Sequence, residues 1–174
     1  MPKMTTQKTP FISAVAPYLK RIERVLLAAL SIGSVLTFWR VEAMTTIQVS
    51  LLGLAIVYFT TAFTILEIPK PIDEIYGFKE LLALVIVPKV LWMCSAVSLF
   101  GGNVYTLHME HNGFNGGLRT GGLGIFICLI ILIYAFLTGT KHLNHLLPHL
   151  ARAMPIFLFD FYLVFVRTNL ITAA

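Results

Sequence analysis

The feature that most constrains this chain is an uncharged run of twenty residues, Ile47–Leu66. A helix of about 20 apolar residues spans the hydrocarbon core of a bilayer, and further apolar runs occur at Val25–Trp39, Leu81–Phe100 and Gly121–Gly139. Only 12% of the residues are charged and 57% are hydrophobic, whereas a soluble domain carries about 25% charged residues. The sequence therefore predicts an integral membrane protein and excludes a disordered chain.

Prolines, glycines and charges separate the apolar runs. Pro69 and Pro71 end the second run, because proline cannot continue the helical hydrogen-bond ladder. Residues 101–120 contain five glycines and three asparagines, which favours a loop. We therefore predict an all-α fold with about four transmembrane helices, arranged as two antiparallel hairpins, and a C-terminal interfacial or re-entrant helix. The predicted segments are a basic N-terminal segment (1–24), a first hairpin (25–66), an interfacial connector (67–80), a second hairpin (81–140) and a His-rich C-terminal segment (141–174).

The C-terminal segment admits two topologies. Its apolar stretch, Pro155–Val166, has twelve residues and would extend only about 18 Å as a helix, which is too short for a hydrocarbon core of about 30 Å. Extension to Ala151–Thr172 reaches a spanning length but includes Arg152, Asp160 and Arg167. We favour an interfacial or re-entrant helix over a fifth span.

The distribution of basic residues predicts the orientation. Cytoplasmic loops of membrane proteins carry an excess of Lys and Arg. With the N-terminus in the cytoplasm, only Arg40 and Arg119 lie in outside connections, and the inside segments hold Lys3, Lys8, Lys20, Arg21, Arg24, Lys70, Lys79, Lys141 and Arg152. We therefore expect a cytoplasmic N-terminus. The net charge of +5 fits contact with lipid headgroups, and we expect no nucleic-acid partner, because no basic patch is interleaved with exposed aromatic residues.

Residues 20–68 resemble a known membrane hairpin. They combine a basic start, the sequence IGSVLTFW, and the sequence LLGLAIVYFTTAF before Glu67 and Pro69. This pattern is similar to the N-terminal hairpin of the gliding-motility protein L family of Bacteroidota. The resemblance implies an oligomeric ring in the bacterial inner membrane, where that family forms a proton-driven motor for type IX secretion and gliding.

Three departures limit what this resemblance implies. The family has a His-Trp-Pro-Gly-type turn, whereas this chain has Arg-Val-Glu-Ala-Met at 40–44. The family's second helix carries an embedded Glu, whereas the matching residues 53–55 are Gly-Leu-Ala. Two further apolar runs follow where the family has a long soluble tail. The motor function is therefore not carried over to this chain.

Lys89 and Asp160 are the candidate membrane-embedded polar residues. In a helix over 81–100, Lys89 would lie near the bilayer centre, where a charge marks a functional site. If the helix instead begins at Lys89, the side chain reaches the interface as part of a basic collar, which we favour because Lys89-Val90-Leu91 repeats the pattern of Arg24-Val25-Leu26. Asp160 could carry protons or pair with Arg152 or Arg167, and we favour the pairing.

The histidines His142, His145 and His149 follow one helical face. Three such side chains could bind zinc, but this spacing beside Lys141 and Arg152 favours an amphipathic collar, and we predict no metal or other cofactor. The sequence contains no GxSxG, HExxH or P-loop pattern. We therefore expect no catalytic residues.

Three functions fit these features. The first is a non-catalytic, multi-pass membrane subunit that acts as a structural or assembly component of a membrane complex, together with other subunits or with copies of itself. The second is a small transporter or channel that uses Lys89 or Asp160 in a polar pathway. The third is a membrane enzyme or redox subunit that uses the histidines. We favour the first.

Overall fold

The computed structural model describes residues 10–39, 42–64, 78–106, 115–139 and 147–162, and these residues form helices and turns without a strand. The prediction of an all-α chain is therefore confirmed for this part of the sequence. Short α3 (Phe78–Leu81) and the π-helix η1 (Leu82–Ile86) lead directly into α4. The helices of fifteen residues or more are α1 (Pro10–Phe38), α2 (Met44–Thr64), α4 (Val87–Thr106), α5 (Asn115–Leu137) and α6 (Leu147–Phe161).

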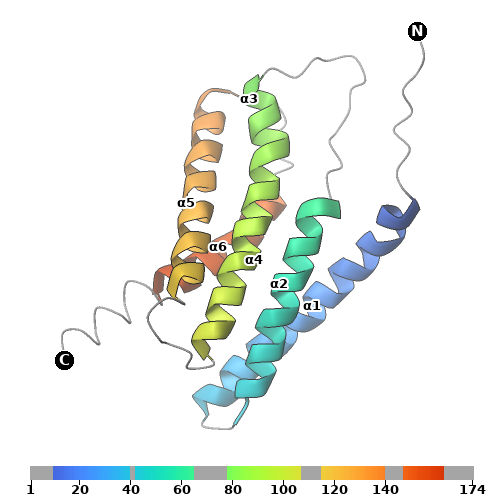
Figure 1. The fold of residues 1–174 in the computed structure, drawn as a ribbon, viewed down its shortest axis with the longest axis vertical. Coiled ribbons are helices and arrows are strands. Elements are labelled where there is room, and N and C mark those ends of the chain that lie inside the picture. Colours follow the sequence, from blue (N-terminus) through green and yellow to red (C-terminus); the bar gives the residue numbers. More distant parts are fainter. Residues whose placement is uncertain (1–9, 40–41, 65–77, 107–114, 140–146, 163–174) are drawn as a thin grey trace, which may run out of the picture.

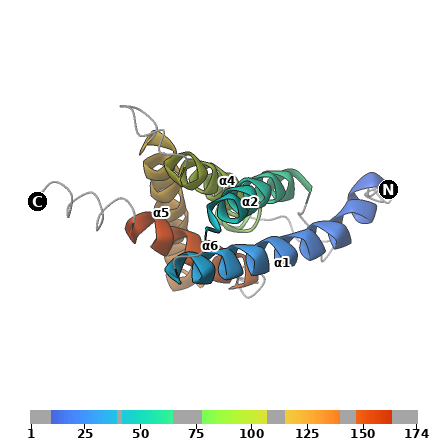
Figure 2. The ribbon, with the colours of Figure 1, turned by 90° about the horizontal axis from the view of Figure 1, so that it is seen from below.

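The helices form a row of two antiparallel hairpins with one helix across it. α1 packs against α2, α2 against α4, and α4 against α5 (Figure 1). α6 crosses the row obliquely and contacts both α4 and α5, and the view from below shows α6 on the same side of the row as α1 (Figure 2). α4 is therefore the central helix, because it packs against α2, α5 and α6.

Two of the described helices are long and apolar enough to cross a membrane, namely Met44–Phe63 within α2 and Gly116–Leu137 within α5. α1 does not meet this criterion because Lys20, Arg21, Glu23 and Arg24 lie in its first half. α4 contains glycines, serines and Asn103, which lower its hydropathy. Membrane insertion is therefore indicated by two helices, and the arrangement of four spans stays a prediction.

α1 begins earlier than the first apolar run, at Pro10. Proline suits the first position of a helix, where its missing N–H has no partner in any case. The helix then continues through Pro17 and the basic residues, and it bends near its N-terminal end (Figure 2), as helices do at an internal proline. Leu19 is buried in the core, so tertiary packing extends the helix beyond the apolar run.

A wide helical turn precedes α4. The backbone N–H of Val87 donates to the carbonyl of Leu82, five residues earlier. Pro88, which follows, has no N–H, and its ring would collide with the carbonyl four residues before it in a regular α-helix. The π turn gives a physical means of accommodating Pro88, so the chain is helical from Phe78 to Thr106.

Glycines bring the backbones of α4 and α5 into direct contact. The prediction of a loop over 101–120 is wrong at both ends of this range, because α4 continues to Thr106 and α5 begins at Asn115. A Cβ atom added at Gly101 would lie 2.6 Å from the backbone nitrogen of Leu118, and one added at Gly121 would lie 2.6 Å from the backbone nitrogen of Ser98. Small residues allow this close approach between helices of membrane proteins. Gly101 and Gly121 therefore serve helix packing rather than a turn.

We predict that Gly101→Ala destabilises the protein, because the added methyl group meets the backbone of α5 rather than a movable side chain. The expected loss is about 1–3 kcal/mol, the usual cost of overpacking, measured by thermal unfolding of the purified protein in detergent. Gly116→Ala is the matched control, since a Cβ at Gly116 meets nothing within 4 Å. Equal melting temperatures for the two variants would contradict the packing role of Gly101.

Candidate functional site

Polar side chains meet where α1, α2 and α6 come together. Glu23 lies on the buried face of α1, one turn after Leu19, and its side chain is only 8% exposed. The carboxylate oxygen Oε1 of Glu23 lies 3.4 Å from Nε of Arg152 on α6, and it accepts a hydrogen bond of 3.4 Å from the hydroxyl of Tyr58 on α2. Arg152 thus supplies the opposite charge that a buried carboxylate requires.

An aromatic pair extends this junction to α4. The rings of Tyr58 and Trp92 are 4.7 Å apart, between centroids, with an edge-on arrangement. The indole Nε1–H of Trp92 donates to Nδ1 of His149 on α6 at 3.2 Å. Trp92 and the carboxylate of Glu23 therefore lie on either side of Tyr58, and we call the five residues Glu23, Tyr58, Trp92, His149 and Arg152 the junction cluster.

His149 accepts the hydrogen bond from Trp92 through Nδ1, so that nitrogen carries no proton. Burial lowers the pKa of His149 below its usual value, and the nearby positive charges of Arg152 and Lys20 lower it further. Both effects favour the neutral imidazole. His149 therefore acts as a hydrogen-bond acceptor that fixes α6 against α4.

A second polar contact lies between α4, α5 and α6. Asp160 is 2% exposed, and its Oδ2 accepts a short hydrogen bond from the hydroxyl of Ser98. Gly122 lies beside this carboxyl group, since a Cβ added there would be 3.3 Å from Oδ2. The other oxygen, Oδ1, is buried and has no hydrogen-bond partner within the described residues. Asp160 therefore keeps one acceptor for a proton or another donor.

The structure separates the residues that the sequence singled out. Lys89 is exposed on α4 and lies outside the junction cluster. The expectation that the helix begins at Lys89 is wrong, because the chain is already helical from Phe78. His149 is partly buried, whereas His142 and His145 lie outside the described residues.

Arg152 pairs with Glu23 and not with Asp160. Eight residues of helix place Arg152 and Asp160 about 12 Å apart along α6, which explains why they do not meet, and Arg167 lies outside the described residues.

Sequence reasoning did not identify Glu23, Tyr58, Trp92 or Ser98. Glu23 was hidden among Lys20, Arg21 and Arg24, although its spacing from Leu19 and Leu26 places it on the apolar face of one helix. Tyr58 lies within an uncharged run, where a hydroxyl group requires a partner. Together, these two signals could have predicted a contact between Glu23 and Tyr58. Nothing in the sequence identifies Trp92 or Ser98 as the residue that contacts α6.

These polar groups can hold protons and can donate or accept hydrogen bonds. No group of three or more metal-binding side chains occurs among the described residues. The hydroxyl of Ser98 donates directly to Asp160, whereas a nucleophile–base relay places a histidine between a serine and an acid. Both free cysteines, Cys94 and Cys128, lie within the helix bundle, and neither is exposed. The contacts observed in this part of the chain join helices.

Comparisons with known proteins find no match to a family model, to a curated protein or to a solved structure. The resemblance of residues 20–68 to the gliding-motility protein L hairpin is not tested by these comparisons and stays a prediction.

We predict that Arg152→Met destabilises the protein more than the double variant Glu23→Gln/Arg152→Met. The single variant leaves the buried carboxylate of Glu23 without a counter-charge, whereas the double variant removes both charges. Breaking a fully buried pair costs about 3–5 kcal/mol, and we expect about 1–3 kcal/mol here because solvent screens the exposed part of Arg152, whose side chain is 38% exposed. Denaturant unfolding in detergent measures both variants. If the double variant is as unstable as the single one, the buried carboxylate of Glu23 does not need Arg152 as its counter-charge.

Proposed function

We propose that this protein is a non-catalytic, multi-pass membrane subunit that acts as a structural or assembly component of a membrane complex or of a homo-oligomer. The observation that carries this proposal is the uncovered apolar face of α5. Only 28% of the apolar stretch Gly116–Leu137 is buried by the rest of the chain. The exposed side chains of this face are Leu123, Phe126, Ile127, Ile130, Ile133, Tyr134, Phe136 and Leu137.

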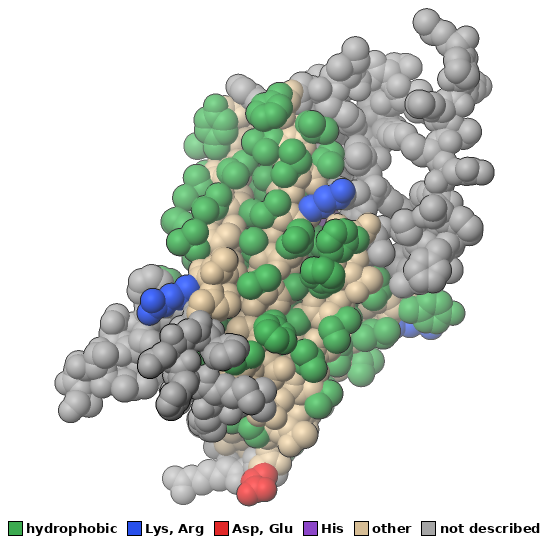
Figure 3. Space-filling view, in the orientation of Figure 1, with side chains coloured by type: hydrophobic (Ala, Val, Ile, Leu, Met, Phe, Trp, Pro, Cys, Tyr) green, Lys and Arg blue, Asp and Glu red, His purple; other side chains and the backbone are tan. Residues whose placement is uncertain are grey.

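The surface of the row supports this proposal. Hydrophobic side chains cover most of the face seen in Figure 3, and charged side chains occur at only a few places on it. A contiguous apolar surface of this kind marks contact with lipid or with another protein. The aromatic residues Phe126, Tyr134 and Phe136 on α5 are residue types that are enriched at protein interfaces.

The interior supports a structural role rather than a catalytic one. Glu23, Tyr58, Trp92, His149 and Arg152 hold α1, α2, α4 and α6 together. Each of these contacts joins two helices, so the polar side chains fix the arrangement of the bundle. A rigid bundle with an apolar exterior is suited to packing beside other membrane subunits.

The proposal includes a topology. α1 and α4 accompany α2 and α5 as the further spans, with α6 as an interfacial or re-entrant helix and the N-terminus in the cytoplasm. The charges Lys20, Arg21 and Arg24 support this orientation under the positive-inside rule. A location in the bacterial inner membrane rests on the resemblance of residues 20–68 alone.

We expect the chain to be part of a larger particle in its membrane. Native mass spectrometry after mild detergent extraction should give multiples of the 19.4 kDa chain mass or a complex with another subunit. Ile130→Cys, on the exposed face of α5, should form cross-links in intact membranes. Ile56→Cys, at an isoleucine of α2 that is also exposed, is the control for random collision. A lone monomer in both measurements would contradict the proposal.

A small transporter is the second candidate, and the carboxyl group of Asp160 supports it. This group is buried and its Oδ1 has no partner among the described residues, so it could bind and release a proton. Lys89 supports transport less, because its exposed position gives it no contact with the interior of this chain.

If Asp160 carries protons, proton flux into proteoliposomes should fall sharply in Asp160→Asn, because an amide cannot be protonated near neutral pH. Asn keeps an acceptor for Ser98, so the variant should fold. Glu42→Gln, at an exposed acid beside the α1–α2 turn, is the control. Flux that Asp160→Asn and Lys89→Ala both leave unchanged would remove the transport candidate.

A further inference from the structure

A groove of about 520 Å³ lies between α1 and α6, with side chains of α2 and α4 also lining it. Its lining is largely apolar and includes Leu27 and Leu30 of α1, Leu51 and Leu54 of α2, and Ile156 of α6. Sites for small organic ligands have volumes of about 300–1,000 Å³ and similar apolar linings. The groove is therefore large enough for a hydrocarbon chain.

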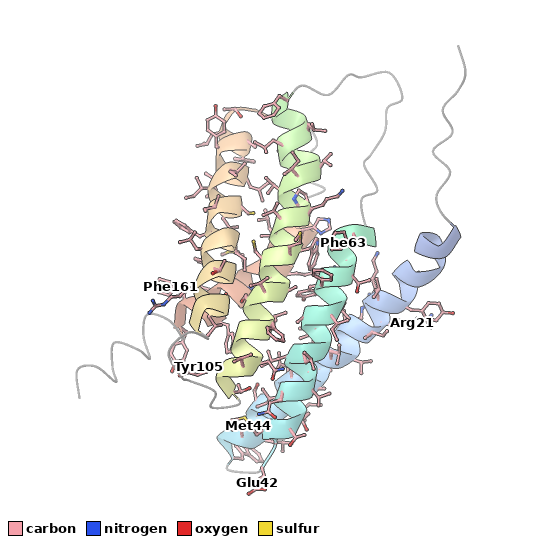
Figure 4. The ribbon with its side chains drawn as sticks, viewed as in Figure 1. Arg21, Glu42, Met44, Phe63, Tyr105 and Phe161 are labelled. Atoms are coloured by element: carbon pink, nitrogen blue, oxygen red, sulfur yellow. The ribbon has the colours of Figure 1, made fainter. Side chains whose placement is uncertain are left out.

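The two ends of the groove differ in charge. Arg152 and Tyr58 of the junction cluster line one part, and Thr37, Met44, Tyr105 and Thr106 line another. Met44 and Tyr105 lie at the same end of the bundle, and Arg21 lies toward the opposite end of α1 (Figure 4). Along α1 the lining runs from Leu27 to Thr37, which is about 15 Å of helix. Along α2 the lining runs from Met44 to Tyr58, which is about 21 Å of helix, so the groove extends over more than half of a hydrocarbon core of about 30 Å.

Basic side chains surround the Arg152 end. Lys20 precedes Leu27 by seven residues, so it lies on the same side of α1 as the groove, about two turns farther along. Lys20 is also close enough to α6 for its positive charge to lower the pKa of His149. Lys20 and Arg24 are exposed, and Arg152 is 38% exposed. Glu23 offsets one of these three positive charges, so this end is positive within the described residues.

The apolar groove and its basic end have the polarity of an anionic lipid. We propose that the groove binds one anionic glycerophospholipid, with an acyl chain between α1 and α6 and its phosphate beside Arg152 and Lys20. In the proposed topology this end faces the cytoplasm, so the lipid belongs to the cytoplasmic leaflet. The site is contained in one chain and does not require the protein to assemble with other subunits. Glu23 is a positioning residue, because it holds the guanidinium of Arg152 at the edge of the groove.

The lipid preference can be measured with the purified full-length chain in detergent. Delipidated protein is titrated with dioleoyl phosphatidylglycerol or with dioleoyl phosphatidylcholine, and bound lipid is counted by native mass spectrometry. We expect one phosphatidylglycerol per chain and weaker binding of phosphatidylcholine. Lys20→Gln should weaken phosphatidylglycerol binding about fivefold, the effect of about 1 kcal/mol per basic residue near an anionic lipid. Lys89→Gln, at an exposed lysine outside the groove, should have no effect. Equal affinity for the two lipids would overturn the proposal.

A second pair of variants tests whether the acyl chain occupies the groove. Ser34 lines the groove and Ser31 does not. Both are exposed serines of α1, and each donates a 2.8 Å hydrogen bond to the carbonyl four residues earlier. Ser34→Trp should fill the groove and abolish binding, whereas Ser31→Trp should leave it intact. Binding that survives Ser34→Trp would overturn the proposal.

If the Ser34→Trp variant does not fold, a smaller substitution at the same position tests the site. Ser34→Cys should be alkylated more slowly after phosphatidylglycerol is added, and Ser31→Cys should be alkylated at the same rate with and without lipid. Peptide mass spectrometry separates the new thiols from Cys94 and Cys128. Equal alkylation of Ser34→Cys with and without the lipid would contradict an acyl chain in the groove.

Discussion

The glycines at the contact between α4 and α5 are the constraint on which the rest of the fold depends. Gly101 and Gly121 let the two backbones touch, and the next glycines in sequence make room for α6. A Cβ at Gly102 would lie 3.2 Å from the ring of Phe159, and one at Gly122 would lie 3.3 Å from the carboxyl group of Asp160. α6 therefore rests on a surface that glycines create. The position of Arg152 at the other end of α6, and with it the groove, depends on that contact.

Polar contacts then determine where α6 meets the first hairpin. A charge in an apolar bundle requires a partner, so the buried carboxylate of Glu23 restricts the places that Arg152 can occupy. Trp92 and His149 add a hydrogen bond between α4 and α6, which is directional where apolar packing is not. The glycines bring α6 close to α4 and α5, and the junction cluster aligns it with α1 and α2. The glycine contacts and the junction cluster thus act on different halves of the same helix.

The helical class of the chain could be predicted because apolar runs and prolines are local signals. The sequence Ala-Phe occurs near the end of both α2 and α5, and in each helix the alanine, Ala62 or Ala135, is buried while the phenylalanine, Phe63 or Phe136, is exposed. The glycines at 101–102 and 116–117 misled the prediction of loop boundaries, because glycine favours both turns and close helix packing. The partners of Asp160 and Arg152 could not be predicted, because they depend on how α6 crosses the row. That crossing is a tertiary property that no local pattern encodes.

The π turn between α3 and α4 has a consequence for how the sequence can vary. A π turn holds one residue more than an α turn, so an inserted residue can be taken up there without changing the helix that follows. Loss of that extra residue would bring the ring of Pro88 against the carbonyl of Leu84. Length variation at Leu82–Ile86 would therefore rotate only the preceding segment, Phe78–Leu81, while Trp92, Ser98 and Gly101 keep their alignment with α2, α5 and α6. An insertion beyond Trp92 would instead turn the glycine face away from α5. Within the described residues, the turn before Pro88 is thus a place where evolution could add a residue, next to a helix that could not accept one.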